Sequence, residues 1–144
     1  MVCMGNICRS PLAEGILKSK IDGKDIFVDS AGTGGWHIGE QPDERSIQIA
    51  DVHQIDISYQ RCRKFSVDDF DEFDRIFVMD STNYRDVMAS ARDINDEKKV
   101  KMILNKIYPG SNKDVPDSYY GGENGFMQVF EMLDEACEVI AKEL

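Results

Sequence analysis

Short runs of β-branched and aromatic residues, bounded by polar positions, recur along the chain at 25–30, 75–80 and 100–104. Each run has the length and composition of one buried strand. Apolar residues at helical spacing lie between and after these runs. A first helix is predicted to open at Ser10 as its cap with Pro11 in its first turn, a second at 42–44, and a long last helix from about Asn124.

Strands that alternate with helices indicate an α/β fold, and here we expect a three-layer α/β/α sandwich around a central, mainly parallel twisted sheet. A chain of 144 residues is long enough to bury a real core. We therefore expect residues 1–144 to form a single domain. In folds of this class, ligands bind beyond the carboxyl ends of the strands, where loops meet helix N-termini.

Composition narrows the classes of function. The chain is 42% hydrophobic and 31% charged, as folded domains usually are, and no apolar run reaches the length of a membrane span. With 17 Lys and Arg against 27 Asp and Glu, the net charge is −10, which argues against broad binding to nucleic acid or acidic membranes. An anionic ligand must then be held by local geometry. Four cysteines do not make a disulfide scaffold, so we expect a reduced, cytoplasmic setting.

The stretch from Cys3 to Pro11 places a cysteine and an arginine around five residues at the opening of the first helix. The backbone N–H groups of such a loop can point inward and bind an anion, and the helix N-terminus adds partial positive charge. Arg9 can bind two phosphate oxygens, and positive surroundings hold Cys3 as the nucleophilic thiolate. Gly5 suits the tight turn and Asn6 can brace it. This stretch predicts a nucleophile inside an anion-binding loop.

An inert role for Cys3 is the alternative, because a cysteine five residues before an arginine arises by chance and a buried cysteine usually acts as a small hydrophobe. The surrounding residues favour the functional interpretation. Only two residues precede Cys3, where a strand would normally lead into such a loop. We therefore expect the first strand to be trimmed from this chain, which leaves secretion open.

The run from Val2 to Pro11 closely resembles the phosphate-binding loop of the low-molecular-weight protein tyrosine phosphatases. The resemblance covers nearly the whole chain, with landmarks in the same order at 29–33, Trp36, Gly39, 42–43, 77–80, Asn83, 85–86 and 115–121. It implies hydrolysis of phosphotyrosine through a cysteinyl-phosphate. Cys3 would attack phosphorus, Arg9 would bind the equatorial oxygens, and Asp117 would protonate the leaving phenolate and then activate water. No metal or other cofactor is implied.

The resemblance also implies roles around the loop. Residues that would hold the phosphate group are Met4, Gly5, Asn6, Ile7, Cys8 and Ser10. Aromatic residues that would wall a crevice too deep for phosphoserine are Trp36, Tyr119 and Tyr120. Ser10 and Ser30 match positions that brace the loop, and Tyr59 stands where the family often has a supporting histidine. Ser118 replaces the proline that usually follows the acid.

Cys8 lies across the loop from Cys3 and is the expected redox partner, since a neighbouring thiol can trap the sulfenic acid of an oxidised thiolate as a disulfide. Cys62 and Cys137 show no metal-ligand spacing, and we interpret both as structural. His37 is interpreted as a surface loop residue.

Three other functions are alternatives to a phosphatase. A catalytically silent phosphotyrosine-binding module would keep the loop without the reaction. An arsenate reductase on the same fold needs two further cysteines, and the matching region at 79–83 holds none. A site for small anions or nucleotides would carry a glycine-rich signature that is not in the sequence. The expected partners are a phosphotyrosine protein and phosphate or sulfate in the loop, with the chain a monomer or weak dimer.

Overall fold

Four parallel strands form the central sheet of the computed structural model, which describes residues 1–117 and 122–144. The strand order is β2-β1-β3-β4, with bounds β1 Val2–Cys3, β2 Ala31–Gly32, β3 Ile76–Val78 and β4 Val100–Met102. Val2 pairs with Ala31 on one side and Val78 on the other, and Ile76 pairs with Val100. The predicted mainly parallel sheet is confirmed.

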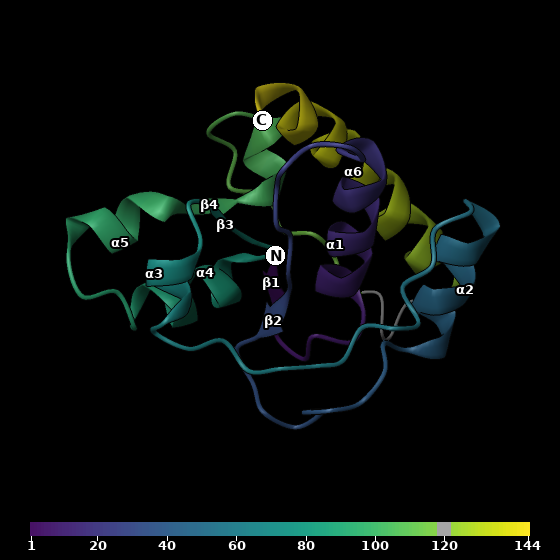
Figure 1. The fold of residues 1–144 in the computed structure, drawn as a ribbon, viewed down its shortest axis with the longest axis horizontal. Coiled ribbons are helices and arrows are strands. Elements are labelled where there is room, and N and C mark those ends of the chain that lie inside the picture. The colour runs from purple at the N-terminus through teal and green to yellow at the C-terminus, as the bar shows by residue number, and fades with distance from the viewer. Residues whose placement is uncertain (118–121) are drawn as a thin grey trace.

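Helices cover both faces of this sheet (Figure 1), with α1 and α6 on one side and α3, α4 and α5 on the other. Helix α2 packs beside α1 and α6. Their bounds are α1 Arg9–Lys20, α2 Glu44–Val52, α3 Asp69–Glu72, α4 Ser81–Met88, α5 Ile94–Lys99 and α6 Gly122–Glu143, with a 3₁₀ turn η1 at Ile103–Lys106. This arrangement is the predicted three-layer sandwich.

Strand β3 shows why both faces must be covered. Side chains alternate along β3 and the residue after it, so that Ile76 and Val78 enter one hydrophobic cluster while Phe77 and the following Met79 enter the other. The first cluster lies under α3 and α4, and the second lies under α1 and α6. Each layer of helices therefore buries one set of side chains. No helix within the described residues is long and apolar enough to cross a membrane.

One sequence-based expectation about the strands is wrong. Residues 25–30 do not form a strand, and Phe27 is 75% exposed. Strand β1 begins at Val2, so only Ala31 and Gly32 have a partner on it, and a β-prone run without a neighbouring strand makes no ladder. The strand that leads into the loop, β1, is two residues long and lies in the middle of the sheet.

Candidate active site

The loop between β1 and α1 lies at the carboxyl end of the central strand, where an open parallel sheet places its ligands. Cys3 is the last residue of β1, and Arg9 is the first residue of α1. Both side chains are almost fully buried. The fold therefore brings the predicted nucleophile and the predicted phosphate-binding residue to the two ends of one short loop, at a helix N-terminus.

Backbone contacts with the segment after β2 hold the loop in place. The Thr33 N–H donates to the Cys3 carbonyl and the Gly34 N–H donates to the Met4 carbonyl, each at 2.9 Å. A Cβ at Gly32 would lie 2.7 Å from the Met4 carbonyl oxygen, so this close approach requires glycine. The loop is pinned to the sheet rather than free to move alone.

Two groups hydrogen bond to the Cys3 sulfur from within the loop and helix. The Asn6 backbone N–H donates to Sγ at 3.2 Å, and the Ser10 hydroxyl lies 3.0 Å away. Ser10 was expected to cap the first helix, but α1 begins at Arg9, so Ser10 lies inside the first turn and turns toward the sulfur. Hydrogen bonds of this kind stabilise negative charge on sulfur.

Arg9 is oriented from behind by two acceptors. Its Nη1 donates to Asp80 Oδ2 at 2.7 Å and to the Val115 carbonyl at 2.9 Å. Burial disfavours its charge, but the Cys3 sulfur and the Asp80 carboxylate outweigh burial and raise the Arg9 pKa. Asp80 is itself fixed as the N-cap of α4, where its Oδ1 accepts from the Asn83 N–H at 2.8 Å. Sequence reasoning gave Asp80 no role, although its place at the end of a parallel strand was a usable signal.

A cleft of about 250 Å³ opens over the loop. It is lined by Cys3, Met4, Gly5, Ile7, Cys8, Arg9, Trp36, His37 and Asp117. Asp117, the predicted acid, thus lines the same cleft as Cys3 and Arg9, and Trp36, 71% exposed, forms part of the wall. His37, interpreted as a surface loop residue, also lines the cleft, and its Nδ1 lies 2.5 Å from Glu40 Oε2. Its position next to Trp36 in the sequence was the signal that could have placed His37 in the cleft.

A larger hollow of about 490 Å³ lies elsewhere, at the amino ends of β1 and β3, and holds none of the predicted catalytic residues. Across the described part of the chain, no three His, Cys, Asp or Glu side chains are grouped as metal ligands. Ser118, Tyr119 and Tyr120 lie outside the described residues.

Asn6 and Ser10 do not line the cleft, although both were predicted to contact the phosphate group. The Asn6 side chain lies behind the loop, where its Nδ2 donates to Ser10 at 2.8 Å and to Ser30 at 3.0 Å. Its Oδ1 accepts from the Arg63 N–H at 3.0 Å. These contacts hold Asn6 in the left-handed region, at φ 56°. The predicted bracing positions of Ser10 and Ser30 are therefore brought together by Asn6.

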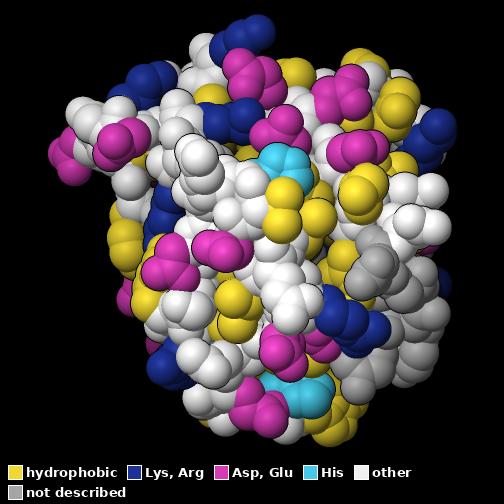
Figure 2. Space-filling model, turned by 90° about the vertical axis from the view of Figure 1, so that its right-hand side faces the viewer, with side chains coloured by type: hydrophobic (Ala, Val, Ile, Leu, Met, Phe, Trp, Pro, Cys, Tyr) yellow, Lys and Arg dark blue, Asp and Glu magenta, His cyan; other side chains and the backbone are white. Residues whose placement is uncertain are grey.

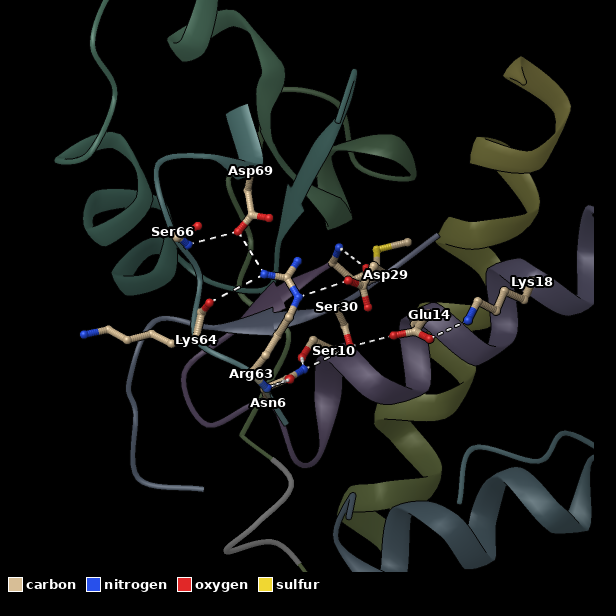
Figure 3. A network of polar contacts seen from close by, with 11 residues as sticks. Asn6, Ser10, Glu14, Lys18, Asp29, Ser30, Arg63, Lys64, Ser66 and Asp69 are labelled. Atoms are coloured by element: carbon tan, nitrogen blue, oxygen red, sulfur yellow. Dashed lines mark hydrogen bonds and ion pairs between the residues drawn. The ribbon is translucent and has the colours of Figure 1, made fainter. Parts of the chain in front are cut away.

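The network continues to a residue that sequence reasoning missed (Figure 3). Ser30 Oγ donates to Glu14 Oε1 at 2.7 Å, and Lys18 Nζ donates to Glu14 Oε2 at 2.6 Å. Tyr59, expected to support the loop serine, is 54% exposed and instead accepts from Lys18 at 3.0 Å. Glu14, rather than Tyr59, is therefore the residue that hydrogen bonds to the bracing serine Ser30. A carboxylate within the apolar positions 12–17 was the sequence signal.

All four cysteines are free thiols, and three of them lie at the loop. Burial, with smaller effects from Asp43 and Cys3, raises the pKa of Cys8 to about 12. Cys62, interpreted as purely structural, donates from Sγ to the Gly5 carbonyl at 3.1 Å, and burial raises its pKa as well. Both thiols are therefore neutral at physiological pH.

Comparisons with known proteins agree with this geometry. The family model "Low molecular weight phosphotyrosine protein phosphatase" matches residues 1–144. A Synechocystis protein carrying the name low molecular weight protein-tyrosine-phosphatase slr0328 is 42% identical over 140 residues, covering 94% of this chain and 88% of its own length.

Solved structures show the same likeness. A protein tyrosine phosphatase from Entamoeba histolytica, crystallised with Hepes in the active site, superposes with a TM-score of 0.91 at 34% identity, covering 99% of this chain and 92% of its own. Vibrio vulnificus Wzb, in complex with benzylphosphonate, superposes with a TM-score of 0.88 at 28% identity, covering 99% and 95%.

Proposed function

This chain belongs to the low molecular weight phosphotyrosine protein phosphatase family, and from that premise we propose that Cys3, Arg9 and Asp117 carry out its hydrolysis of phosphotyrosine. One observation supports the proposal most directly: the Cys3 sulfur lies beneath a cleft that Arg9 and Asp117 also line. The proposal treats residues 1–144 as one catalytic domain.

In the first step, the Cys3 thiolate attacks phosphorus in line with the phenolic oxygen. The S–P bond forms as the P–O bond to the tyrosine breaks, and Asp117 gives its proton to the departing phenolate. Arg9 and the loop N–H groups bind the equatorial oxygens, whose charge they stabilise in the transition state. Because Asp80 and Val115 already fix Nη1, the guanidinium needs little reorganisation when the anion arrives.

In the second step, water attacks the cysteinyl-phosphate. Asp117, now a carboxylate, takes a proton from the water as the new P–O bond forms and the S–P bond breaks. Phosphate leaves and Cys3 returns to the thiolate. The hydrogen bond from the Asn6 backbone N–H and the contact with Ser10 support the sulfur as a leaving group.

The shape of the cleft supports an aryl phosphate as substrate. The sulfur lies at the base, while Trp36 lines the rim, so a flat ring fits between the reacting phosphorus and the protein surface. A relative of known structure holds benzylphosphonate, which pairs an aromatic ring with a phosphonate, and a second, Wzb from Escherichia coli K30, holds sulphate. Phosphotyrosine in a protein, with inorganic phosphate as product, is the matching chemistry.

The test is phosphate release from a phosphotyrosine peptide and from the same peptide carrying phosphoserine, each with the parent chain and with Cys3→Ser. We expect release only from phosphotyrosine and only by the parent. Peptide binding without release would instead support the silent binding module. Consumption of arsenate, without release of phosphate from either peptide, would support the arsenate reductase.

A further inference from the structure

A groove of about 430 Å³ lies at the edge of the sheet, between helix α4 and strand β4. Its lining includes Ser81, Tyr84 and Arg85 of α4, Lys101 of β4, and Asn105 and Asn112 beyond that strand. We infer that this groove is a docking site for an acidic, extended stretch of the phosphoprotein substrate, apart from its phosphotyrosine. The inference rests on the proposed function, because it names a second feature of the same substrate.

Strand β4 forms one edge of the sheet. It pairs in parallel with β3, and no other strand of the described residues pairs with it. All three residues of β4 line the groove, although Val100 and Met102 are buried in the cluster under α4. The groove therefore follows the strand itself rather than one of its side chains. An unpaired strand edge can bind an extended peptide as one further strand.

Both charged side chains that line this groove are positive. Arg85 and Lys101 are exposed, and neither forms an ion pair with a described residue; the Arg85 guanidinium makes one long hydrogen bond, 3.5 Å, to the Thr82 hydroxyl. The hollow at the amino ends of β1 and β3, by contrast, is lined by five acidic side chains and one arginine. In a chain with a net charge of −10, a groove lined by two cations and no carboxylate favours an anionic occupant.

The two cations lie on opposite faces of the sheet edge. Val100 and Met102 face the cluster under α4, so Lys101, between them, projects from the other face, whereas Arg85 comes from α4. The side chains of an added strand alternate between the same two faces. Successive carboxylates of an extended stretch can then meet Arg85 and Lys101 in turn. A run of acidic residues, rather than a single one, therefore matches the groove.

The walls of the groove are held in place by the rest of the protein. Tyr84 packs against the hydrophobic cluster under α4. Beyond β4, Asn105 Nδ2 donates to Asn112 Oδ1 at 2.9 Å, and the Asn112 N–H donates to Asn105 Oδ1 at 2.8 Å. Because these residues are already ordered, binding of a peptide requires little further ordering of the protein.

The groove also reaches the edge of the sheet at which the cleft opens. Ser81, which lines the groove, directly follows Asp80, the residue that binds Arg9. Asn112 lines the groove on the same segment that carries Asp117 to the cleft. One extended chain can therefore place its phosphotyrosine in the cleft and its acidic residues along β4.

The test compares phosphotyrosine peptides that carry a run of glutamates with matched peptides that carry glutamines. The run is placed before or after the phosphotyrosine through short and long Gly-Ser spacers, and kcat/KM is measured for each peptide. The net charge of the protein disfavours glutamate, so a preference for glutamate must come from a local site. For at least one placement we expect the parent to favour glutamate about threefold to tenfold, the effect of two exposed charge pairs, and to lose this preference at high salt.

Arg85→Gln/Lys101→Gln should abolish the preference and leave hydrolysis of 4-nitrophenyl phosphate unchanged. Lys24→Gln/Lys142→Gln is the matched control, because it removes the same charge from two exposed lysines that form no ion pair with a described residue, and it should keep the preference. A parent without preference at any placement, or an Arg85→Gln/Lys101→Gln variant that keeps it, would overturn the inference; Lys101 would then only protect a short strand edge from pairing. If that variant fails to fold, Lys101→Gln alone decides, and an undiminished preference overturns the inference.

A binding measurement separates this inference from the proposed function. In a Cys3→Ser background, the fluorescence anisotropy of the same peptides, labelled, reports docking without hydrolysis, and we expect the same preference for glutamate through Arg85 and Lys101. That preference, in a chain whose parent releases no phosphate, would refute only the proposed function. A glutamate run that binds the groove by itself but gives no advantage when joined to phosphotyrosine would indicate an acidic partner other than the substrate, and would overturn the inference.

Discussion

Two aspartates three residues apart, Asp114 and Asp117, look alike in the sequence but occupy different positions in the structure. Asp114 and Asp117 flank Val115 in the same exposed segment. The structure separates them, because Asp114 accepts from the Ser81 N–H at the start of α4 while Asp117 lines the cleft. Only the second can exchange a proton with a bound substrate.

Asp117→Asn should therefore lower kcat/KM for a phosphotyrosine peptide, which reports formation of the cysteinyl-phosphate, by about 10² to 10⁴, the usual contribution of a general acid. The loss should be much smaller for 4-nitrophenyl phosphate, whose leaving group departs without protonation. Steady-state kinetics on both substrates measure this. Asp114→Asn is the control, and an equal loss in both variants would argue against Asp117 as the acid.

The thiol of Cys8 is neutral, which protects Cys8 from direct attack by an oxidant. With a pKa of about 12, it carries almost no thiolate near neutrality. Peroxide should oxidise Cys3 first, and Cys8 should then condense with the sulfenic acid, releasing water and forming a disulfide. Parent protein treated with peroxide should regain its activity with dithiothreitol, while Cys8→Ser should recover much less. Full recovery of Cys8→Ser would remove this role.

At the scale of elements, the position of Arg9, the proposed phosphate-binding residue, depends on how two helices begin. Asp80 caps α4 with Oδ1 and binds Arg9 with Oδ2. One carboxylate thus connects the end of β3, the start of α4 and the start of α1. A substitution that keeps the cap and removes only the ion pair separates these functions.

Asp80→Asn is that substitution, since its amide oxygen can still accept from Asn83. We expect kcat/KM to fall about tenfold, because the Arg9 guanidinium loses a charged partner, while the unfolding free energy changes by less than about 1 kcal/mol. Kinetics and urea denaturation measure the two quantities. Asp93→Asn, at the corresponding cap of α5, should leave kcat/KM unchanged. Unchanged kcat/KM in Asp80→Asn would show that Val115 alone orients Arg9.

Elements also show what the sequence could predict. Helix α2 begins after Asp43 and α6 at Gly122, close to the predictions, because caps and apolar stripes are local signals. The run at 25–30 has equally good local signals and fails, because a strand also needs a partner. The residues of the site also divide into those that local sequence signals reveal and those that they do not. Cys3 and Arg9 lie in one local motif, whereas Glu14, Asp80 and His37 acquire their places from tertiary contacts.

The whole molecule is acidic, with a net charge of −10, yet on one of its faces the charges are dispersed. Figure 2, which faces the α2 and α6 side, shows acidic and basic side chains interspersed with apolar ones rather than gathered into a single patch of one sign. The phosphate group of a substrate therefore depends on the loop and Arg9 for attraction. The stability of the whole molecule responds to pH through groups buried in its core.

Cys137 is such a group. It is fully buried on α6, and burial raises its pKa from 9.0 to about 12. The unfolded chain releases this proton near pH 9 and the folded chain only near 12, so the contribution of Cys137 to stability is complete below pH 9 and is lost as the pH rises toward 12.

Between these pH values, the unfolding free energy of the parent should fall by about 1.4 kcal/mol per pH unit more than that of Cys137→Ala. Urea denaturation at several pH values measures the two slopes, whose difference cancels other titrating groups. Cys137→Ala will be less stable at every pH because of its cavity, so only the slope is informative. Parallel slopes would contradict the assignment.

The chain holds one tryptophan, and that residue is Trp36 at the rim of the cleft. Its indole is exposed to water in the free protein and would be covered by the ring of an aryl phosphate. Intrinsic emission excited at a wavelength selective for indole therefore comes from the binding site alone. Occupancy of the cleft can be followed optically in the unlabelled protein, in real time, even in variants that no longer turn over.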